Sequence, residues 1–263
     1  MEIKDKRIVL TGAAGGMGSI LAAELAQRGA QLALVDANAD ALGHISSQLT
    51  GSHAIAGDLS SASGCRIVAD QCLAKLGSID LLINLAGINS FAAYEDESPE
   101  KIEAMIHVNL LAPMWLARAF LPVMQEKNAG SIINVGSIFG SIGFAYFTVY
   151  SASKFGLRGF SEALRRELAD TNISVTYIAP RAVKTAMNSD ALIRMGEATK
   201  MNMDAPEDIV KKIISAIENN RKDIYFGFPE SFFVRINAIF PRLVDKALAA
   251  QNRIARAFAK GEQ

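Results

Sequence analysis

Residues 7–18 read RIVLTGAAGGMG and combine a short apolar run with a cluster of glycines. The β-branched and aliphatic run at the start is typical of a strand that is buried on both faces. Gly12, Gly16 and Gly18 follow within a few residues, and the helical pattern of residues 17–28 begins among them. A strand that turns through glycines into a helix lets its backbone approach a pyrophosphate closely. The alternative is an ordinary glycine turn without a ligand.

Short apolar runs and longer helical patterns alternate along the rest of the chain, with no linker, repeat or low-complexity tract between them. This alternation predicts an α/β fold, namely a Rossmann-type doubly wound parallel sheet in a single domain. Residues 1–230 form the predicted dinucleotide-binding catalytic domain, and residues 231–263 form a C-terminal amphipathic helical extension of it. The predicted strands cover residues 7–11, 31–36, 53–58, 80–87, 131–137, 173–180 and 223–227. The predicted helices cover residues 17–28, 39–49, 61–76, 99–127, 150–170 and 206–219.

The charge balance of the chain does not favour nucleic-acid binding. Its 263 residues include 27 Lys and Arg and 27 Asp and Glu, so the formal net charge is zero. A protein that binds nucleic acid usually carries an excess of basic residues on one face. Half of the residues are hydrophobic, which is enough for a sizeable core. We therefore expect a globular protein with no nucleic-acid partner.

Three features favour a cytoplasmic protein. The first residues, MEIKDKRIVLTG, are charged and enter a strand directly, unlike a signal peptide. Cys65 and Cys72 are the only cysteines and lack the spacing of a metal or redox pair, so we predict small core residues of one helix in a reducing compartment. Residues 128–153 carry no formal charge, but eleven of them are Gly, Ser or Asn, which argues against a membrane span.

An acidic residue ends the second predicted strand. Asp36 lies 18 residues beyond the last motif glycine. A carboxylate there accepts hydrogen bonds from both hydroxyls of an adenine ribose, whereas a 2′-phosphate would meet it charge against charge. Neither Ala14 nor Ala37 offers a basic group that would offset this repulsion, so the sequence favours NAD over NADP. The alternative is a strand-end Asp in a turn. Asp58 and Leu59, after the third strand, are further candidates for contact with adenine.

The sequence YSASK, residues 150–154, places a phenol and an ammonium four residues apart. Residues i and i+4 share a helix face, so Tyr150 and Lys154 should project together. Lowering the phenol pKa by about 3 units requires roughly 4 kcal/mol. An ammonium at about 4 Å supplies that order of energy at an effective dielectric constant near 20. The pair is therefore suited to proton transfer, and the alternative is a solvated helix face.

Taken together, these motifs resemble those of the short-chain dehydrogenases/reductases, in their shorter single-domain branch, over nearly all of residues 5–227. The glycine motif of that family, T-G-x-x-x-G-x-G, corresponds to Thr11–Gly18, and its Y-x-x-x-K corresponds to Tyr150–Lys154. The family's catalytic serine precedes the tyrosine by about a dozen residues and matches Ser137 in NVGS. Its active-site asparagine follows the fourth strand and matches Asn109 in HVNLL.

This resemblance implies a role for each catalytic residue. Tyr150 would exchange the hydroxyl proton of the substrate, and Ser137 would hold the substrate oxygen. Lys154 would bind the nicotinamide ribose and lower the tyrosine pKa, while Asn109 would anchor a water molecule that links Lys154 to solvent. No metal is expected. The resemblance also implies a set of residues that contact NAD: Gly12, Gly16, Met17, Gly18, Asp36, Asp58, Leu59, Asn84, Ala86, Gly87, Tyr150, Lys154, Pro180, Val183 and Thr185.

Two positions depart from the family pattern. After the fourth strand the family often has N-N-A-G, whereas this chain has NLAG, with Leu85 in place of a polar residue. Because Asn84, Ala86 and Gly87 remain, we expect the wall of the cofactor site to be kept. After the sixth strand, Arg181 replaces the glycine of a P-G pair. We expect this arginine to place a cation near the nicotinamide or the substrate, and the alternative is a solvated loop arginine.

Two stretches predict an apolar substrate pocket. Residues 138–149 contain four aromatic side chains and no charge, and residues 187–203 contain four of the nine methionines. Aromatic and thioether groups suit an adaptable apolar site, so we expect a lipophilic secondary alcohol or ketone as the small-molecule substrate. Ordinary core or lid packing is the alternative. Relatives commonly associate through the helices that contain Asn109 and Tyr150, which implies a homodimer or a homotetramer.

The C-terminal extension is apolar at first, in SFFVRINAIF, and Pro241 can begin a further helix that ends near Ala259. An apolar arc on this helix would oppose a basic arc. Three interpretations remain open: packing on the body or on a sister subunit, a lid over a lipophilic pocket, and docking on an anionic membrane. We expect packing on protein that extends the apolar surroundings of the substrate. Alternatives to an enzyme are a non-catalytic nucleotide-binding scaffold and a membrane-surface protein that uses the C-terminal helix. The apolar arc comprises Leu243, Val244, Ala247, Leu248, Ile254 and Phe258.

Overall fold

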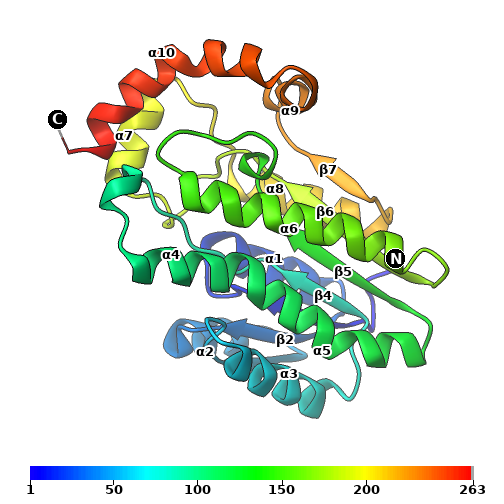
Figure 1. Ribbon diagram of the computed structural model, residues 1–263. Coiled ribbons are helices and arrows are strands. Elements are labelled where there is room, and N and C mark those ends of the chain that lie inside the picture. Colours follow the sequence, from blue (N-terminus) through cyan, green and yellow to red (C-terminus); the bar gives the residue numbers. More distant parts are fainter. Residues whose placement is uncertain (262–263) are drawn as a thin grey trace.

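The computed structural model describes residues 1–261 and contains one seven-stranded sheet (Figure 1). Every pair of neighbouring strands is parallel, and the strand order is β3-β2-β1-β4-β5-β6-β7. The predicted Rossmann-type doubly wound sheet is therefore confirmed. The strands are β1 (Arg7–Thr11), β2 (Gln31–Asp36), β3 (Ser52–Ala56), β4 (Leu81–Asn84), β5 (Gly130–Val135), β6 (Ile173–Ala179) and β7 (Asp223–Tyr225).

Helices cover both faces of the sheet, because the inner strands are largely apolar and are buried on both sides. One layer contains α1 (Gly16–Gln27), α2 (Ala39–Ser47) and α8 (Pro206–Glu218), whose apolar side chains form one core cluster with the sheet. The opposite layer contains α3 (Ala62–Leu76), α5 (Ala112–Glu126) and α6 (Thr148–Glu167), which form a second core cluster.

The strand order reverses between β1 and β4. From β1 the chain winds outward through β2 to β3, and it then returns to place β4 on the other side of β1. The loops that follow these two strands therefore diverge, and they leave a crevice at the carboxyl ends of the strands. The predicted functional residues follow strands β1 to β6, so the fold brings them to this one edge.

Helical structure differs from the prediction in two places. The predicted helix at residues 99–127 consists of α4 (Pro99–Ile106), a π-helical turn (His107–Leu111) and α5. Helix α7 (Asp190–Ala198) lies in the segment after β6, where no helix was predicted. Two further helices, α9 (Glu230–Ile239) and α10 (Pro241–Ala259), end the described chain, and α10 packs against α7 and α9 (Figure 1).

The buried environment of α3 and α5 accounts for two sequence features. Cys65 and Cys72 are both free and buried on α3, which confirms that they are core residues. Within residues 1–261, one helical stretch, Pro99–Glu126, is long and apolar enough to cross a membrane. In this fold its residues Leu116 and Phe120 are fully buried against the sheet.

Candidate active site

The glycine loop after β1 is held in contact with the loop after β4. Gly12 has a φ of +70°, and a Cβ atom there would lie 2.8 Å from the Cα atom of Ala86. A Cβ atom at Gly18 would lie 2.0 Å from the carbonyl oxygen of Gly12. The Thr11 hydroxyl accepts hydrogen bonds from the backbone amides of Leu85 and Ala86, each at 3.1 Å. Glycine is therefore required at both positions, because backbone occupies the space of a side chain.

A cavity of about 300 Å³ runs from this loop across the ends of β2 and β3. Asp36 lies on its wall, where its carboxylate accepts hydrogen bonds from the amides of Ala14 and Asn38, both at 3.0 Å. These bonds tie β2 to the glycine loop and fix the carboxylate in the crevice. The other predicted contacts that line this cavity are Gly12, Gly16, Met17, Gly18, Asp58, Leu59, Ala86, Gly87 and Thr185.

One predicted cofactor residue is turned away from the cavity. The Asn84 side chain is 2% exposed and donates a hydrogen bond to Asn134 Oδ1 on the neighbouring strand, at 2.8 Å. Asn134 in turn donates to the Ser161 hydroxyl of α6, also at 2.8 Å. Asn84 therefore lies inside the sheet, behind the cavity wall rather than on it, and links β4 to α6 through Asn134.

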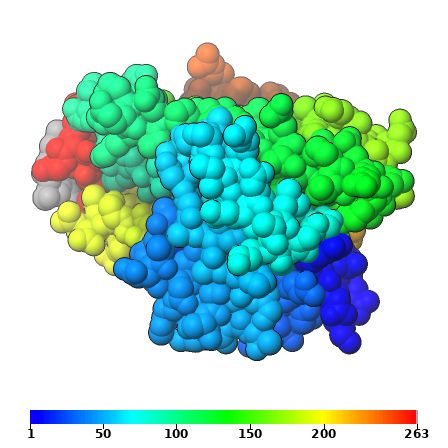
Figure 2. Space-filling model, turned by 90° about the horizontal axis from the view of Figure 1, so that it is seen from below, coloured from blue at the N-terminus to red at the C-terminus, as the bar shows by residue number. Residues whose placement is uncertain are grey.

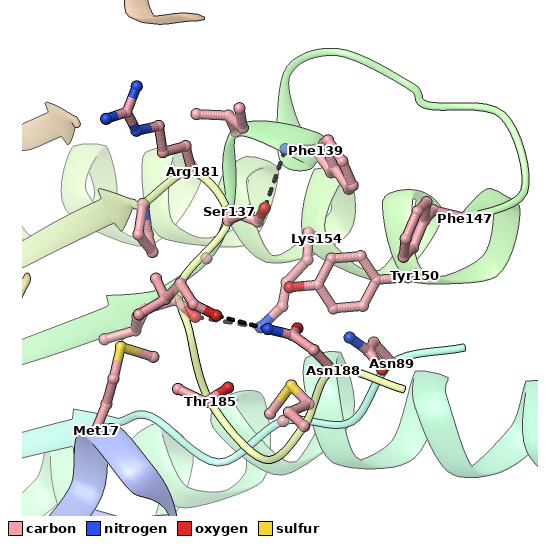
Figure 3. Close-up of a pocket in the computed structure, with 18 of the residues that line it drawn as sticks. Met17, Asn89, Ser137, Phe139, Phe147, Tyr150, Lys154, Arg181, Thr185 and Asn188 are labelled. Atoms are coloured by element: carbon pink, nitrogen blue, oxygen red, sulfur yellow. Dashed lines mark hydrogen bonds between the residues drawn. The ribbon is translucent and has the colours of Figure 1, made fainter. Parts of the chain in front are cut away.

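A second pocket, next to the first, gathers the predicted catalytic side chains (Figure 3). Ser137 follows β5, and Tyr150 and Lys154 lie one turn apart on α6, so all three face the same space. The ammonium of Lys154 donates to the carbonyl oxygen of Val135 at 3.2 Å and lies 5.7 Å from the Tyr150 ring centre. Pro180, Val183 and Thr185 line the opposite wall.

Asn109 lies on the π-helical turn and is fully buried. Its amide exchanges two hydrogen bonds with the backbone of Ile88, at 2.9 and 2.8 Å, and donates to the Ser153 hydroxyl at 3.1 Å. A Cβ atom at Gly87 would lie 3.3 Å from Asn109 Oδ1 and 3.5 Å from Lys154 Nζ. Asn109 and Lys154 therefore flank the same glycine, and the π turn, a form frequent at functional sites, carries Asn109 there.

A buried tyrosine supports the loop that carries Ser137. Tyr177, on β6, is 1% exposed, and its hydroxyl donates to the carbonyl oxygen of Ser137 at 3.1 Å. A Cβ atom at Gly136 would lie 2.2 Å from this hydroxyl oxygen, and one at Gly140 would lie 2.3 Å from it. The two glycines therefore leave room for the phenol beneath the loop. The hydrogen bond from the phenol to the Ser137 carbonyl holds the backbone of Ser137 in position at the pocket.

The comparisons with known proteins agree with this geometry. The family model described as short chain dehydrogenase matches residues 6–195. The chain belongs to the short-chain dehydrogenase family. It is an oxidoreductase of that family, with a fold that binds a nicotinamide dinucleotide.

The proteins similar to this short-chain dehydrogenase include a reductase and two family members of known structure. A 3-oxoacyl-[acyl-carrier-protein] reductase of Bos taurus is 36% identical over 71% of this chain and 79% of its own length. A Burkholderia phymatum family member, solved in complex with NAD, has a TM-score of 0.84 at 23% identity, covering 93% of this chain and 96% of its own. A metagenomic member in complex with NADP has a TM-score of 0.72 at 26% identity, covering 85% and 98%.

The electrostatics of the catalytic pair in this short-chain dehydrogenase differ from the sequence-based expectation. Burial raises the pKa of Tyr150 to about 12, and the Ser137 hydroxyl opposes this rise. Burial also lowers the pKa of Lys154 to about 8. The sequence argument counted the attraction of the ammonium and omitted the desolvation of both groups, which the surrounding apolar side chains impose. In the protein alone, therefore, Lys154 does not bring the phenol pKa below its ordinary value.

Arg181 lines the catalytic pocket, as expected, but its charge is paired with two carboxylates. Its guanidinium forms ion pairs with Asp204 at 2.7 Å and with Glu230 at 3.1 Å. In Figure 3 the side chain points away from Tyr150 and Lys154. A Cβ atom at Gly227 would lie 2.6 Å from Arg181 Cδ, so this glycine gives the arginine room. Arg181 is thus neither a free cation at the site nor a solvated loop residue, and it connects the loop after β6 to the start of α9.

Sequence reasoning missed several residues of the pocket in this dehydrogenase. Asn89 and Asn188 bring polar side chains to it, and Asn188 donates to the carbonyl oxygen of Val183 at 2.8 Å. The rule that sites lie beyond strand ends would have found Asn89, which follows β4 by five residues. No local signal marks Asn188, because its position depends on the fold of the segment between β6 and α7. Within residues 1–261, no group of three His, Cys, Asp or Glu residues is arranged to hold a metal ion.

Proposed function

We propose that this oxidoreductase interconverts a secondary alcohol and a ketone with NAD(H), and that Tyr150 is its acid/base residue. The observation that carries the proposal is that the cavity at the glycine loop continues into the pocket of Ser137, Tyr150 and Lys154. The two spaces share five lining residues: Met17, Leu85, Gly87, Thr185 and Met187. A dinucleotide that lies along them would therefore end beside the phenol.

The catalytic residues would divide the proton transfer between them. In the oxidation direction, the substrate gives its hydroxyl proton to Tyr150 while Ser137 holds the same oxygen. Lys154 is 4% exposed and donates a hydrogen bond to the Val135 carbonyl oxygen. Its remaining N–H groups would be available to a ribose. Since burial raises the pKa of Tyr150 to about 12, the phenol needs a further positive charge nearby before it can act as a base near neutral pH.

The residues present fit a bound NAD. The cavity wall at the glycine loop includes Asp36 and Asp58 and no Lys or Arg among the described residues. A 2′-phosphate would meet these carboxylates without a compensating cation, whereas two ribose hydroxyls can donate to Asp36. Gly12 and Gly18 would let the pyrophosphate approach the backbone at the start of α1. When bound, the nicotinamide supplies the acceptor or donor of a hydride.

A third cavity, of about 330 Å³, supports a lipophilic substrate. It lies between the segment after β5 and helices α9 and α10. It shares five lining residues with the catalytic pocket: Ile138, Phe139, Arg181, Ala182 and Met201. The rings of Phe139 and Phe144 stack at 5.1 Å along its wall. Val244, Ala247 and Leu248 of α10 contribute the far side. An apolar chain could pass from the catalytic pocket into this space, which agrees with the expectation that the tail extends the surroundings of the substrate.

The test is a panel of secondary alcohols of increasing chain length, with NADH formation followed by absorbance. We expect kcat/KM to rise with chain length. Ala247→Trp, which would fill the third cavity, should raise KM about tenfold for long alcohols and leave short ones unchanged. Ala249→Trp, at an exposed position on the same helix, is the matched control. Equal effects of the two variants would exclude the cavity as part of the substrate site.

The alternative of a non-catalytic nucleotide-binding scaffold predicts tight NADH binding with no turnover on any alcohol or ketone of the panel. The complete set of Asn109, Ser137, Tyr150 and Lys154 favours the enzyme. A cytoplasmic location, a homodimer or homotetramer through α5 and α6, and the division of the chain near residue 230 remain predictions. Size-exclusion chromatography with light scattering would test the assembly.

A further inference from the structure

The outer side of α9 and the start of α10 carry a concentration of exposed apolar side chains. Seven of the thirteen large hydrophobic residues that are exposed in residues 1–261 lie between Phe228 and Ile254. Five of them, which we call the elbow surface, lie around α9 and its junction with α10. They are Phe228, Phe232, Ile239, Phe240 and Leu243, each between 53% and 79% exposed. Monomeric proteins rarely expose this much apolar surface in one place without a partner.

The geometry of the helices explains why these residues stay exposed. Phe232 and Ile239 are seven residues apart, so they lie on one face of α9, and Val234 on another face is buried against the body. Phe240 and Leu243 follow at the junction, where the Leu243 amide donates to the Phe240 carbonyl oxygen at 3.0 Å. Helices α9 and α10 form the upper edge of the molecule in Figure 1. In the perpendicular view of Figure 2, the orange segment projects beyond the outline of the green helices.

This arrangement differs from the one that the helical pattern of α10 predicted. Val244 is buried, and Leu248 and Phe258 pack on core clusters, as expected for the apolar arc. Leu243 and Ile254, assigned to the same arc, are 58% and 42% exposed. The packed arc of α10 is therefore already covered by protein, and the uncovered apolar surface lies at the junction with α9.

Positive charge accompanies the elbow surface. Residues 228–263 contain six basic and three acidic residues, a net charge of +3, so the rest of this neutral chain carries −3. Arg235, on α9, and Lys246, on α10, are both exposed and form no ion pair with any described residue. Arg242 is 94% exposed and makes one weak pair with Asp245.

We propose that the elbow surface docks this protein on an anionic lipid bilayer. Exposed aromatic and aliphatic side chains would enter the interface between headgroups and acyl chains, and the adjacent cations would meet anionic headgroups. The same charge disfavours the competing occupant, a second copy of the chain, because two such surfaces would bring like charges together. Phe233 and Val244, which are sequence neighbours of Phe232 and Leu243 in the elbow surface, line the third cavity, so its rim would lie close to the lipid.

The docking surface would serve a lipophilic substrate that is dissolved in the bilayer, and this benefit rests on the proposed function. The binding itself does not. If the protein binds vesicles and turns over no alcohol, the docking proposal stands and the catalytic one fails. If it turns over long alcohols without binding vesicles, the catalytic proposal stands and the docking one fails.

The test is flotation of the full chain with vesicles of phosphatidylcholine and phosphatidylglycerol in a 3:1 ratio, compared with phosphatidylcholine alone. We expect binding to the anionic vesicles that falls with added salt. Arg235→Glu/Lys246→Glu should weaken this binding roughly 25-fold or more, given about fivefold for each basic residue near the membrane surface. Ile239→Ser/Phe240→Ser should weaken it at least tenfold, and both variants should bind NADH normally. Tyr94→Ser, a control at a 60% exposed aromatic residue outside this surface, should float like the wild type.

A fluorescence measurement locates the contact. Trp115, on α5, is the single tryptophan of the chain, and it packs beside His107 at 6.0 Å. In Trp115→Phe/Phe240→Trp the only indole would lie on the elbow surface, and brominated lipids in anionic vesicles should quench it, whereas they should not quench Trp115 of the wild type. Wild-type protein that fails to float, or elbow variants that float unchanged, would overturn the proposal. A loss of oligomer mass in these variants, with flotation intact, would assign the surface to a second copy.

Discussion

The two ends of the reaction pocket are built by different means. On the nucleotide side, backbone contacts set the shape: the glycine loop touches the loop after β4, and the Asp36 carboxylate is held by two amides. On the substrate side, charged side chains from distant segments set it, since Arg181 joins Asp204 and Glu230. The first kind of construction is marked by short sequence motifs, although its contacts join residues up to 75 positions apart. The second joins residues up to 49 positions apart that belong to no recognisable motif.

The largest expected effect lies at the junction of the two ends. Tyr150→Phe removes the hydroxyl that we propose exchanges the proton and keeps the ring, so turnover should fall by about 10²–10⁴-fold. NADH binding, measured by fluorescence titration, should stay within about twofold. Tyr146→Phe, in the segment just before α6, is the control. If the Tyr150→Phe enzyme kept a third or more of the wild-type rate, Tyr150 would not be the acid/base residue.

A substitution of Lys154 tests whether burying its ammonium in the pocket lowers the free energy of unfolding. A pKa that falls from 10.5 to about 8 on burial corresponds to about 3 kcal/mol. The unfolded chain binds more protons between these two values, so stability should rise with pH across that window. Lys154→Met should therefore unfold at higher urea concentration than the wild type below pH 8, although it loses activity.

The difference in unfolding free energy between Lys154→Met and the wild type should disappear as the pH approaches 10.5. Lys101→Met, at an exposed position on α4, should show no such trend. Urea unfolding curves at pH 7, 9 and 10 would measure this trend. A difference in unfolding free energy that stays constant over this range would contradict a lowered pKa of a buried Lys154.

Arg181 tests the substrate side. Its guanidinium and the carboxylates of Asp204 and Glu230 are only 13–23% exposed, so Arg181→Met should leave two poorly solvated charges. We expect a loss of about 2 kcal/mol of unfolding free energy, between the values for exposed and fully buried pairs. Arg242→Met breaks a pair whose arginine is 94% exposed and should cost less than about 0.5 kcal/mol. Urea denaturation of both variants measures the contrast, and equal losses would show that the Arg181 cluster does not hold this side together.

The smallest expected effect concerns the choice of cofactor. NADH should bind at least tenfold more tightly than NADPH, because the Asp36 carboxylate would repel the 2′-phosphate of NADPH. Asp36→Ser should reduce this ratio of affinities to about threefold. Asp40→Ser, an exposed change on α2, should leave it unchanged. Fluorescence titration with both nucleotides provides the measurement. Equal affinities in the wild type would mean that backbone contacts alone shape the nucleotide side.

This contrast explains how much the sequence could predict. The seven strands, the glycine loop and the pair of Tyr150 and Lys154 could be located because each depends on a short pattern: an apolar run, a glycine motif, or two side chains one helical turn apart. Ser137 and Asn109 were assigned only through the family resemblance. The ion pairs of Arg181 could not be predicted, since its partners lie 23 and 49 residues away and no local pattern connects them. Helix α7 was missed because it is only nine residues long and lies in a segment that was interpreted as part of the substrate pocket. The phenol pKa was misjudged because desolvation depends on packing that a linear sequence does not show.

The phenol of Tyr177 has a consequence for the evolutionary history of the active site. It occupies the space in which side chains at Gly136 and Gly140 would lie, so these three positions cannot change independently. A lineage that gains a side chain at either glycine must first replace the tyrosine by a smaller residue, and the reverse order would displace Ser137. We therefore expect these positions to covary among relatives, with glycine at 136 and 140 wherever an aromatic residue stands at 177.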